Sequence, residues 1–254
     1  MLRSRIIPCL LVKNKGLVKT VSFKDPKYVG DPINAVKIFN EKLVDELVVL
    51  DIDASRENRE PDYKMIENLA TECRMPFCYG GGIKTVEQAV RISNLGVEKI
   101  ALSSCALETP EIITEISRAI GRQSVVVVLD IKKTLFGGYE CYILNGTKKI
   151  KGDVVELAKH VQDLGAGEIV INSIDNDGKM SGYDHKLIRL IRSAIDIPLT
   201  VLGGAGSLQD IKSVIDEHKV IGVAAGSLFV FKGTYRAVLI NYPSVEDKKL
   251  LNTR

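Results

Sequence analysis

Two pairs of short segments have the composition of phosphate-binding loops. Gly81 and Gly82 belong to a run of three glycines, and Gly203 and Gly204 belong to a Gly-Gly-Ala-Gly run. Glycines let backbone N–H groups approach phosphate oxygens closely, and small hydroxyl residues at a helix N-terminus add further donors. Such small residues follow each run at a similar distance, namely Ser103 and Ser104 after the first and Gly226 and Ser227 after the second. One glycine run alone is more often a tight turn, but two runs, each paired with a serine segment, predict a ligand with a phosphate at each end.

Eight apolar segments rich in β-branched residues could position these loops. They lie at residues 6–12, 46–52, 76–79, 99–102, 125–130, 168–171, 198–202 and 220–225. Continuous apolar runs are typical of parallel strands that are covered on both faces. Amphipathic segments of helical period separate them, at residues 32–43, 63–73, 86–95, 110–120, 153–164, 185–194 and 208–217.

Eight strands alternating with helices in 254 residues predict an α/β fold, a single (β/α)8 TIM barrel over residues 1–254. Residues 233–254 carry little signal and form a C-terminal tail of uncertain structure. A doubly wound open sheet is the alternative, disfavoured because no Gly-x-Gly-x-x-Gly follows the first strand. The segments at 13–30 and 134–152 are longer than ordinary βα connections, so we expect a functional loop in the first and a small hairpin in the second.

The chain aligns with itself at an offset of about half its length. The glycine runs and the serine segments repeat at the same offset of 123 residues. This repeat predicts two similar half-barrels and two phosphate sites related by an approximate twofold axis. Barrels commonly bind phosphate after strands 7 and 8, which agrees with the second pair of loops.

Composition excludes several classes of partner. Lys and Arg number 35 against 32 Asp and Glu, a net charge of +3 without a long basic block, so nucleic acid is not the expected partner. The five cysteines include no Cys-x-x-Cys pair, and the three histidines lie on predicted helices, so neither a metal site nor a cofactor is expected. No apolar run is long enough to span a membrane. We therefore expect a cytoplasmic protein.

Several motifs together resemble one family. They are Arg5-Ile-Ile-Pro-Cys-Leu10, Asp45-Glu46-Leu47, Gly80-Gly81-Gly82-Ile83, Gly165-Ala166-Gly167-Glu168, Ser173-Ile174-Asp175-Asn176-Asp177-Gly178, Ser181-Gly182-Tyr183-Asp184 and Gly203-Gly204-Ala205-Gly206. From residue 1 to about 232 the chain resembles the cyclase subunit of imidazole-glycerol-phosphate synthase. The resemblance implies a bisphosphorylated ribonucleotide as substrate, ammonia delivered through the barrel, and a glutaminase subunit docked on its N-terminal face.

The resemblance breaks at the residues that carry the chemistry. In that family, aspartates at the ends of strands 1 and 5 perform the acid–base work. Asp130 matches the second, but Leu11 stands where the first belongs, and a leucine transfers no proton. Losing a positioned acid or base typically costs 10²–10⁴-fold in rate. Asp53, at the end of strand 2, is a possible substitute, and Asn172 and Leu202 also depart from the family's pattern.

Other matches remain intact. Arg5, Glu46, Lys99 and Glu168 match the family's charged ammonia gate, although surface charges are more commonly a solvated ring of ion pairs. Lys19 in the first long loop matches a lysine that grasps substrate, and Asp177 and Gly178 match donors to the C-terminal phosphate.

Two functions of different kinds follow. In the first, the chain is an authentic cyclase of histidine biosynthesis that adds ammonia to the ribonucleotide. In the second, it is a divergent copy that passes ammonia to a third protein. The family includes such copies, which serve a sugar amidotransferase in the synthesis of acetamidino sugars for surface polysaccharide. Leu11 favours the second and the phosphate loops favour the first. The related sugar-phosphate isomerase is disfavoured, because it needs the strand-1 aspartate and has no use for an ammonia gate.

Overall fold

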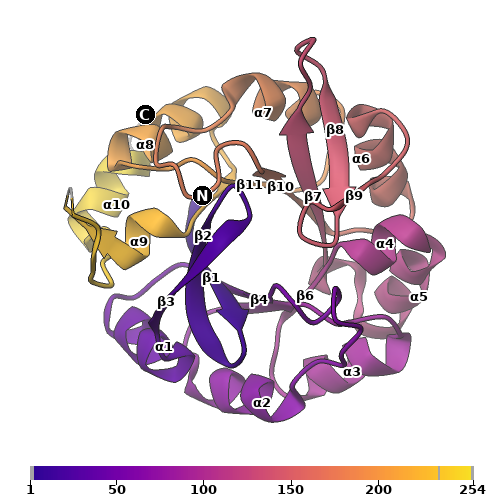
Figure 1. Ribbon diagram of the computed structural model, residues 1–254, viewed down its shortest axis with the longest axis horizontal. Helices are drawn as coiled ribbons and strands as arrows, with labels where there is room; N and C mark the ends of the chain where they lie inside the picture. The colour runs from indigo at the N-terminus through magenta and orange to yellow at the C-terminus, as the bar shows by residue number, and fades with distance from the viewer. Residues whose placement is uncertain (1–2, 234, 253–254) are drawn as a thin grey trace.

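The computed structural model describes residues 3–233 and 235–252, and it contains a closed barrel of eight parallel strands (Figure 1). In barrel order the strands are β1 (Arg5–Lys13), β4 (Leu47–Asp51), β5 (Phe77–Gly80), β6 (Lys99–Leu102), β7 (Val125–Lys133), β10 (Glu168–Ser173), β11 (Leu199–Leu202) and β12 (Gly222–Ala225). Pairing of β10 with β7 and of β1 with β12 closes the sheet. The predicted barrel is confirmed.

Helices surround the barrel on the outside (Figure 1). They are α1 (Pro32–Glu41), α2 (Tyr63–Glu72), α3 (Val86–Asn94), α4 (Ser104–Glu108), α5 (Glu111–Ile120), η1 (Arg122–Ser124), α6 (Val154–Asp163), α7 (His185–Arg192), α8 (Leu208–His218), α9 (Ser227–Val230) and α10 (Val245–Asn252). Side chains cap several of their starts: Asp31 caps α1, and Ser207 forms a capping box with Asp210 on α8.

The long segment after the first strand is more ordered than a loop. It forms a hairpin of β2 (Gly16–Val21) and β3 (Lys24–Gly30), and β2 pairs antiparallel with the end of β1. Burial of Leu17 and Val18 holds the hairpin against the barrel. In Figure 1 this indigo hairpin lies in front of the barrel opening. A second hairpin, β8 (Tyr139–Ile143) with β9 (Lys148–Lys149), extends β7 as expected.

The C-terminal segment is tied to the barrel by polar contacts. Strands β13 (Phe231–Lys232) and β14 (Ala237–Val238) pair with each other before α10. On α10, Lys248 Nζ donates to Leu43 O at 2.8 Å and to Asp45 Oδ1 at 2.9 Å. Tyr242 Oη donates to the carbonyl of Ile6 at 2.8 Å. These contacts attach the segment to the end of the barrel where the strands begin.

The hydrophobic core has two layers. The larger lies between strands and helices, and the smaller fills the barrel itself. The inner layer consists of small and medium apolar side chains: Ile7, Cys9, Val48, Cys78, Ala101, Val126, Val128, Val170, Leu202 and Ala224, with Leu11 and Leu50 packed on it. The inside of the barrel is therefore apolar from its base almost to its mouth. All five cysteines are free thiols.

Candidate functional site

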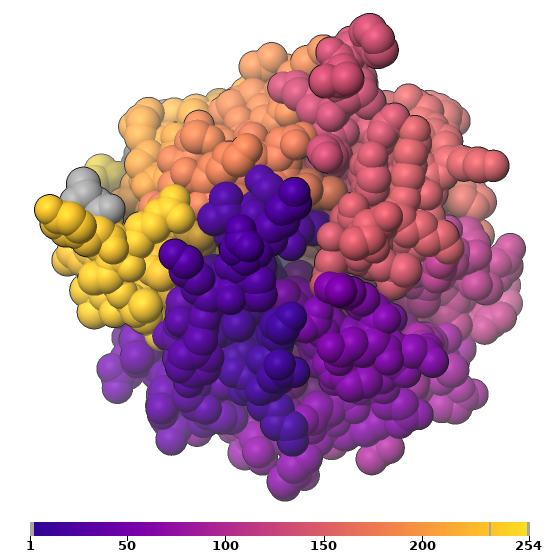
Figure 2. Space-filling model, in the orientation of Figure 1, coloured from indigo at the N-terminus to yellow at the C-terminus, as the bar shows by residue number. Residues whose placement is uncertain are grey.

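A cavity of about 140 Å³ opens at the ends of the strands, where parallel barrels carry their active sites. Figure 2 shows the surrounding face, where the indigo β2–β3 hairpin lies beside the insert that follows β7. Residues from both half-barrels line the cavity. They include Gly81, Gly82, Ser103 and Ser104 from the first half, and Asp177, Gly226 and Ser227 from the second.

The glycine loops are built for close backbone approach. Gly81 and Gly203 have φ of 119° and 92°, a region that disfavours side chains. A Cβ on Gly81 would collide with the carbonyl of Asp51, and one on Gly204 with that of Gly182. Because β5 and β11 are four strands apart in the ring, the two loops lie on opposite sides of the mouth. Gly203, Gly204 and Gly178 do not line this cavity.

One hydroxyl in the cavity has no partner. Ser103 Oγ is buried and makes no hydrogen bond within residues 3–233 and 235–252. Its neighbour Ser104 accepts a long hydrogen bond from the backbone of Leu144, at 3.4 Å. A buried donor without an acceptor is costly, so Ser103 is suited to an acceptor-rich ligand such as a phosphate.

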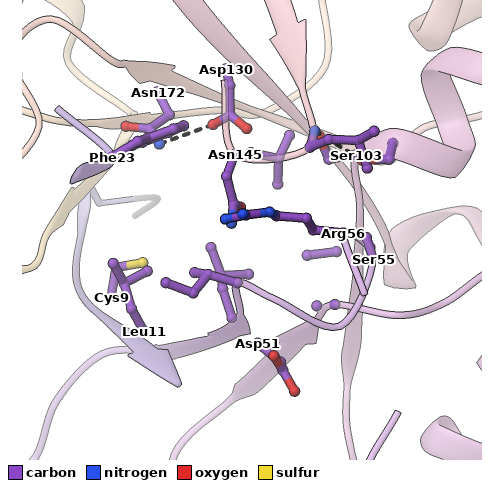
Figure 3. A pocket seen from close by; sticks show the side chains of 18 of the residues that line it. Cys9, Leu11, Phe23, Asp51, Ser55, Arg56, Ser103, Asp130, Asn145 and Asn172 are labelled. Carbon is purple, nitrogen blue, oxygen red and sulfur yellow. Dashed lines mark hydrogen bonds between the residues drawn. The ribbon is translucent and has the colours of Figure 1, made fainter. Parts of the chain in front are cut away.

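Asp130 is one of three carboxylates that line the cavity, with Asp51 and Asp177 (Figure 3). Burial, reinforced by the charge of Asp177, raises its pKa to about 7, although a hydrogen bond from Asn172 Nδ2 to Oδ1 at 3.0 Å opposes this rise. A carboxyl group with a pKa near 7 can both take and give a proton near neutral pH. Leu11 also lines this cavity and carries no such group.

Asp53 lies apart from Asp130. Its buried side chain forms an ion pair with Lys13 Nζ through Oδ2 at 2.9 Å and accepts from Asn145 Nδ2 through Oδ1 at 3.4 Å. Asp53 does not line the cavity, whereas its sequence neighbours Ser55 and Arg56 do. Its position thus suits a tie between the loops that follow β1, β4 and β8 better than proton transfer.

Lys19 is buried rather than extended into solvent. Nζ donates to the carbonyl of Cys9 at 2.7 Å, and burial lowers the pKa of its ammonium group. A Cβ on Gly226 would overlap this ammonium group, so the glycine leaves it space. Next to it, Thr20 Oγ1 donates to Asp177 Oδ2 at 2.9 Å, which joins the β2–β3 hairpin to the loop after β10. Lys19 is thereby held at the cavity wall.

Phe23, Arg56 and Asn145 are among the lining side chains that were not singled out in the sequence. Arg56 extends across the cavity in Figure 3. Each lies on a connection rather than a strand end, which explains why motif reasoning passed over them. The length of the first and fifth βα connections was the available signal for Phe23 and Asn145.

The four charges at the base of the barrel form one closed cluster. Arg5 hydrogen-bonds Glu46 and Glu168, the latter from Nη2 at 2.7 Å. Lys99 Nζ lies 2.8 Å from Glu46 Oε1 and 2.8 Å from Glu168 Oε2. Both carboxylates are buried, and Arg5 and Lys99 hold the pKa of Glu168 at about 2 in spite of that burial. Each charge therefore has partners of opposite sign.

A small cavity lies inside the barrel, between the cluster and the mouth. It measures about 20 Å³, room for roughly one water-sized molecule. Glu46 and Glu168 line it at one end, while Leu50 and Leu202 line both it and the mouth cavity. Its remaining wall is mainly aliphatic, which suits a small neutral molecule better than an ion.

Other kinds of site are not found in the part of the chain that the structure describes. No three His, Cys, Asp or Glu side chains there are arranged to hold a metal ion. No helix among those residues is long and apolar enough to cross a membrane.

Comparison with known proteins agrees with these features. A family model described as "Histidine biosynthesis protein" matches residues 5–236. A Vibrio vulnificus protein provisionally named imidazole glycerol phosphate synthase subunit hisF3 is 62% identical over 98% of this chain and 96% of its own length. A Pseudomonas aeruginosa protein provisionally named as subunit hisF2 is 53% identical, over 96% and 98%. The subunit HisF of Alkaliphilus metalliredigens is 40% identical, over 90% and 91%, so this chain is more similar to the two proteins above than to that subunit.

Proposed function

Because the chain belongs to the histidine biosynthesis protein family, as a divergent copy of the imidazole glycerol phosphate synthase cyclase subunit, we propose that it is the barrel subunit of a glutamine amidotransferase complex. A glutaminase subunit docks on the N-terminal face and releases ammonia at the charged cluster. Ammonia then crosses the apolar interior to the mouth. The observation that carries this proposal is the closed cluster of Arg5, Glu46, Lys99 and Glu168 at the base of the barrel, next to an internal cavity of about 20 Å³.

The barrel conducts ammonia without transforming it, and a third protein, a sugar amidotransferase of surface-polysaccharide synthesis, consumes the ammonia at the mouth. Support comes from the character of the mouth. Leu11, Leu50 and Leu202 face the cavity, and Asp130 has no second carboxylate on strand 1 to exchange protons with. An apolar exit keeps ammonia neutral, because protonation to ammonium is disfavoured where the charge would be desolvated.

Cyclase chemistry at the mouth is the second candidate. It is supported by Asp130, whose raised pKa suits proton transfer, and by Ser103, whose unpartnered hydroxyl suits a phosphate. In this reading, Asp130 assists addition of ammonia to a bisphosphorylated ribonucleotide that is held between the two glycine loops. No cofactor is required for either function.

One experiment separates the two. The purified chain and its Leu11→Asp variant are assayed with ammonium chloride and the bisphosphorylated ribonucleotide used by cyclases of the family. We expect no turnover by the wild type and turnover by Leu11→Asp, since the substitution restores the missing proton carrier. Robust turnover by the wild type contradicts the conduit function and supports the cyclase. Failure of the wild-type barrel to bind any glutaminase subunit, measured by analytical ultracentrifugation, contradicts the complex itself.

A further inference from the structure

Thr200 is a buried hydroxyl residue in contact with both the charged cluster and the internal cavity. It lies on β11, is 1% exposed and lines the small cavity. Its Oγ1 donates to Glu168 Oε1 at 2.5 Å and accepts from Arg5 Nη2 at 3.5 Å. A hydroxyl-to-carboxylate bond of this length is of the strong, charge-assisted kind. Among the residues that line the cavity, Thr200 alone carries a hydroxyl group.

The neighbouring strand makes room for this hydroxyl. Gly222 on β12 lies directly opposite Thr200 in the sheet. A Cβ on Gly222 would overlap Thr200 Oγ1. Gly222 is not among the residues with positive φ, so its backbone does not require glycine. Glycine is needed here because a side chain at position 222 would occupy the space of the threonine hydroxyl.

Glu168 depends on Thr200 for one of its oxygens. Oε2 accepts from Lys99 Nζ at 2.8 Å and from Arg5 Nη1 at 3.4 Å, while Oε1 is shared by Arg5 Nη2 and Thr200 Oγ1. If the hydroxyl were absent, Oε1 would keep only the guanidinium, and the carboxylate, which lines the cavity, would lose its hydrogen bond from β11. The hydroxyl therefore fixes the orientation of Oε1 within the charged cluster.

We propose that Thr200 is a fifth member of the charged cluster, a positioning residue that holds Glu168. Its hydroxyl is also the first one that a small N–H donor contacts on passing from the cluster into the barrel. Threonine oxygen has two lone pairs, and the contact from Arg5 at 3.5 Å is long, so acceptor capacity remains for a molecule in the cavity. The identification of this molecule as ammonia rests on the proposed function, whereas the positioning of Glu168 is independent of it.

Thr200→Val and Thr200→Ser test the proposal as a matched pair. Valine keeps the shape and removes the hydroxyl, and serine keeps the hydroxyl and removes a methyl group. In crystal structures of the unliganded barrel, we expect Glu168 Oε1 to remain against the hydroxyl in Thr200→Ser and to turn away in Thr200→Val. An unchanged carboxylate in Thr200→Val, or a displaced one in Thr200→Ser, overturns the proposal whatever the barrel transports.

A second measurement concerns transfer. In the complex with the glutaminase subunit, products formed per glutamine hydrolysed are compared with products formed from ammonium chloride, using the acceptor that the wild-type complex serves. We expect Thr200→Val to lower the glutamine-driven yield about tenfold with the ammonium-driven rate retained, and Thr200→Ser to restore the yield. An equal loss from both ammonia sources contradicts a role at the base. If the wild-type complex serves no acceptor, the proposed function fails and the crystal structures alone decide the role of Thr200.

Discussion

Asn172 Nδ2 donates to Asp130 Oδ1 over 3.0 Å, between residues that face each other directly across β10 and β7. The contact fixes the orientation of the carboxyl group at the inner wall of the mouth. It also leaves Asn172 Oδ1 buried without a hydrogen-bond partner among the described residues. Asn172 therefore acts on the chemistry of Asp130 rather than serving the packing of the barrel alone.

Removing this amide should raise the pKa of Asp130 above about 7. A hydrogen bond donated to a carboxylate stabilises its charged form, so loss of Nδ2 in Asn172→Leu favours the protonated form. We expect a rise of about one pH unit, measured by ¹³C NMR titration of the labelled carboxyl group. Asn145→Leu is the matched control, because Asn145 lines the same cavity but contacts Asp53. If the pKa of Asp130 rose equally in Asn145→Leu, the cause would be a more apolar cavity and not loss of the hydrogen bond from Asn172.

Asp130 should make the protein less stable as pH rises. Its folded pKa of about 7 exceeds the unfolded value of about 3.9, so the folded chain binds the proton more tightly, and stability is lost between about pH 4 and pH 7. Asp130→Asn should then be roughly 4 kcal/mol more stable than the wild type at pH 8 and no more stable at pH 4. Urea unfolding at both pH values measures this, with the exposed Asp163→Asn as control. A pH-independent difference would show that Asp130 ionises normally.

The charged cluster should depend strongly on Arg5. Arg5→Ala leaves Glu46 and Glu168 buried with Lys99 as the remaining cation of the cluster, which should cost about 3 kcal/mol of unfolding free energy. The double variant Arg5→Ala with Glu168→Gln should recover part of that loss, because it removes the uncompensated charge. Arg3→Ala is the control, since Arg3 is 68% exposed where it approaches Asp45. Equal losses in Arg3→Ala and Arg5→Ala would mean that burial of the cluster is unimportant.

How far the sequence predicts this structure depends on the kind of signal. The strands were predictable because continuous apolar runs are a local signal of the sequence. The direction of a side chain at a strand end was not. Asp53 stands at the predicted end of strand 2, yet its carboxylate is drawn to Lys13 and away from the cavity. Thr200 belongs to no sequence motif, because its role depends on Gly222, a neighbour on another strand.

Ser103 should contribute to phosphate binding and not to folding. Its buried hydroxyl has no partner in the residues described, so Ser103→Ala should leave the unliganded protein equally stable or slightly more stable. Affinity for inorganic phosphate should fall about fivefold, the value of one hydrogen bond, when measured by isothermal titration calorimetry. Ser193→Ala on the exposed end of α7 is the control. Unchanged affinity in Ser103→Ala would remove this residue from the phosphate site.

Lys13 should hold the loops at the mouth through Asp53. The side chain of Asp53 is only 3% exposed, and Lys13 Nζ lies 2.9 Å from Oδ2, so Lys13→Met leaves a buried carboxylate with Asn145 alone. We expect backbone amides near residues 13–16 and 144–146 to exchange hydrogen about tenfold faster, since local opening becomes easier. Lys15→Met is the matched control, because Lys15 is 81% exposed in its 3.3 Å pair with Asp62. The alternative is that Asp53 transfers protons in place of the aspartate that Leu11 replaces. In that case the wild type would turn over the ribonucleotide, Asp53→Asn would abolish this turnover, and Lys13→Met would leave hydrogen exchange unchanged.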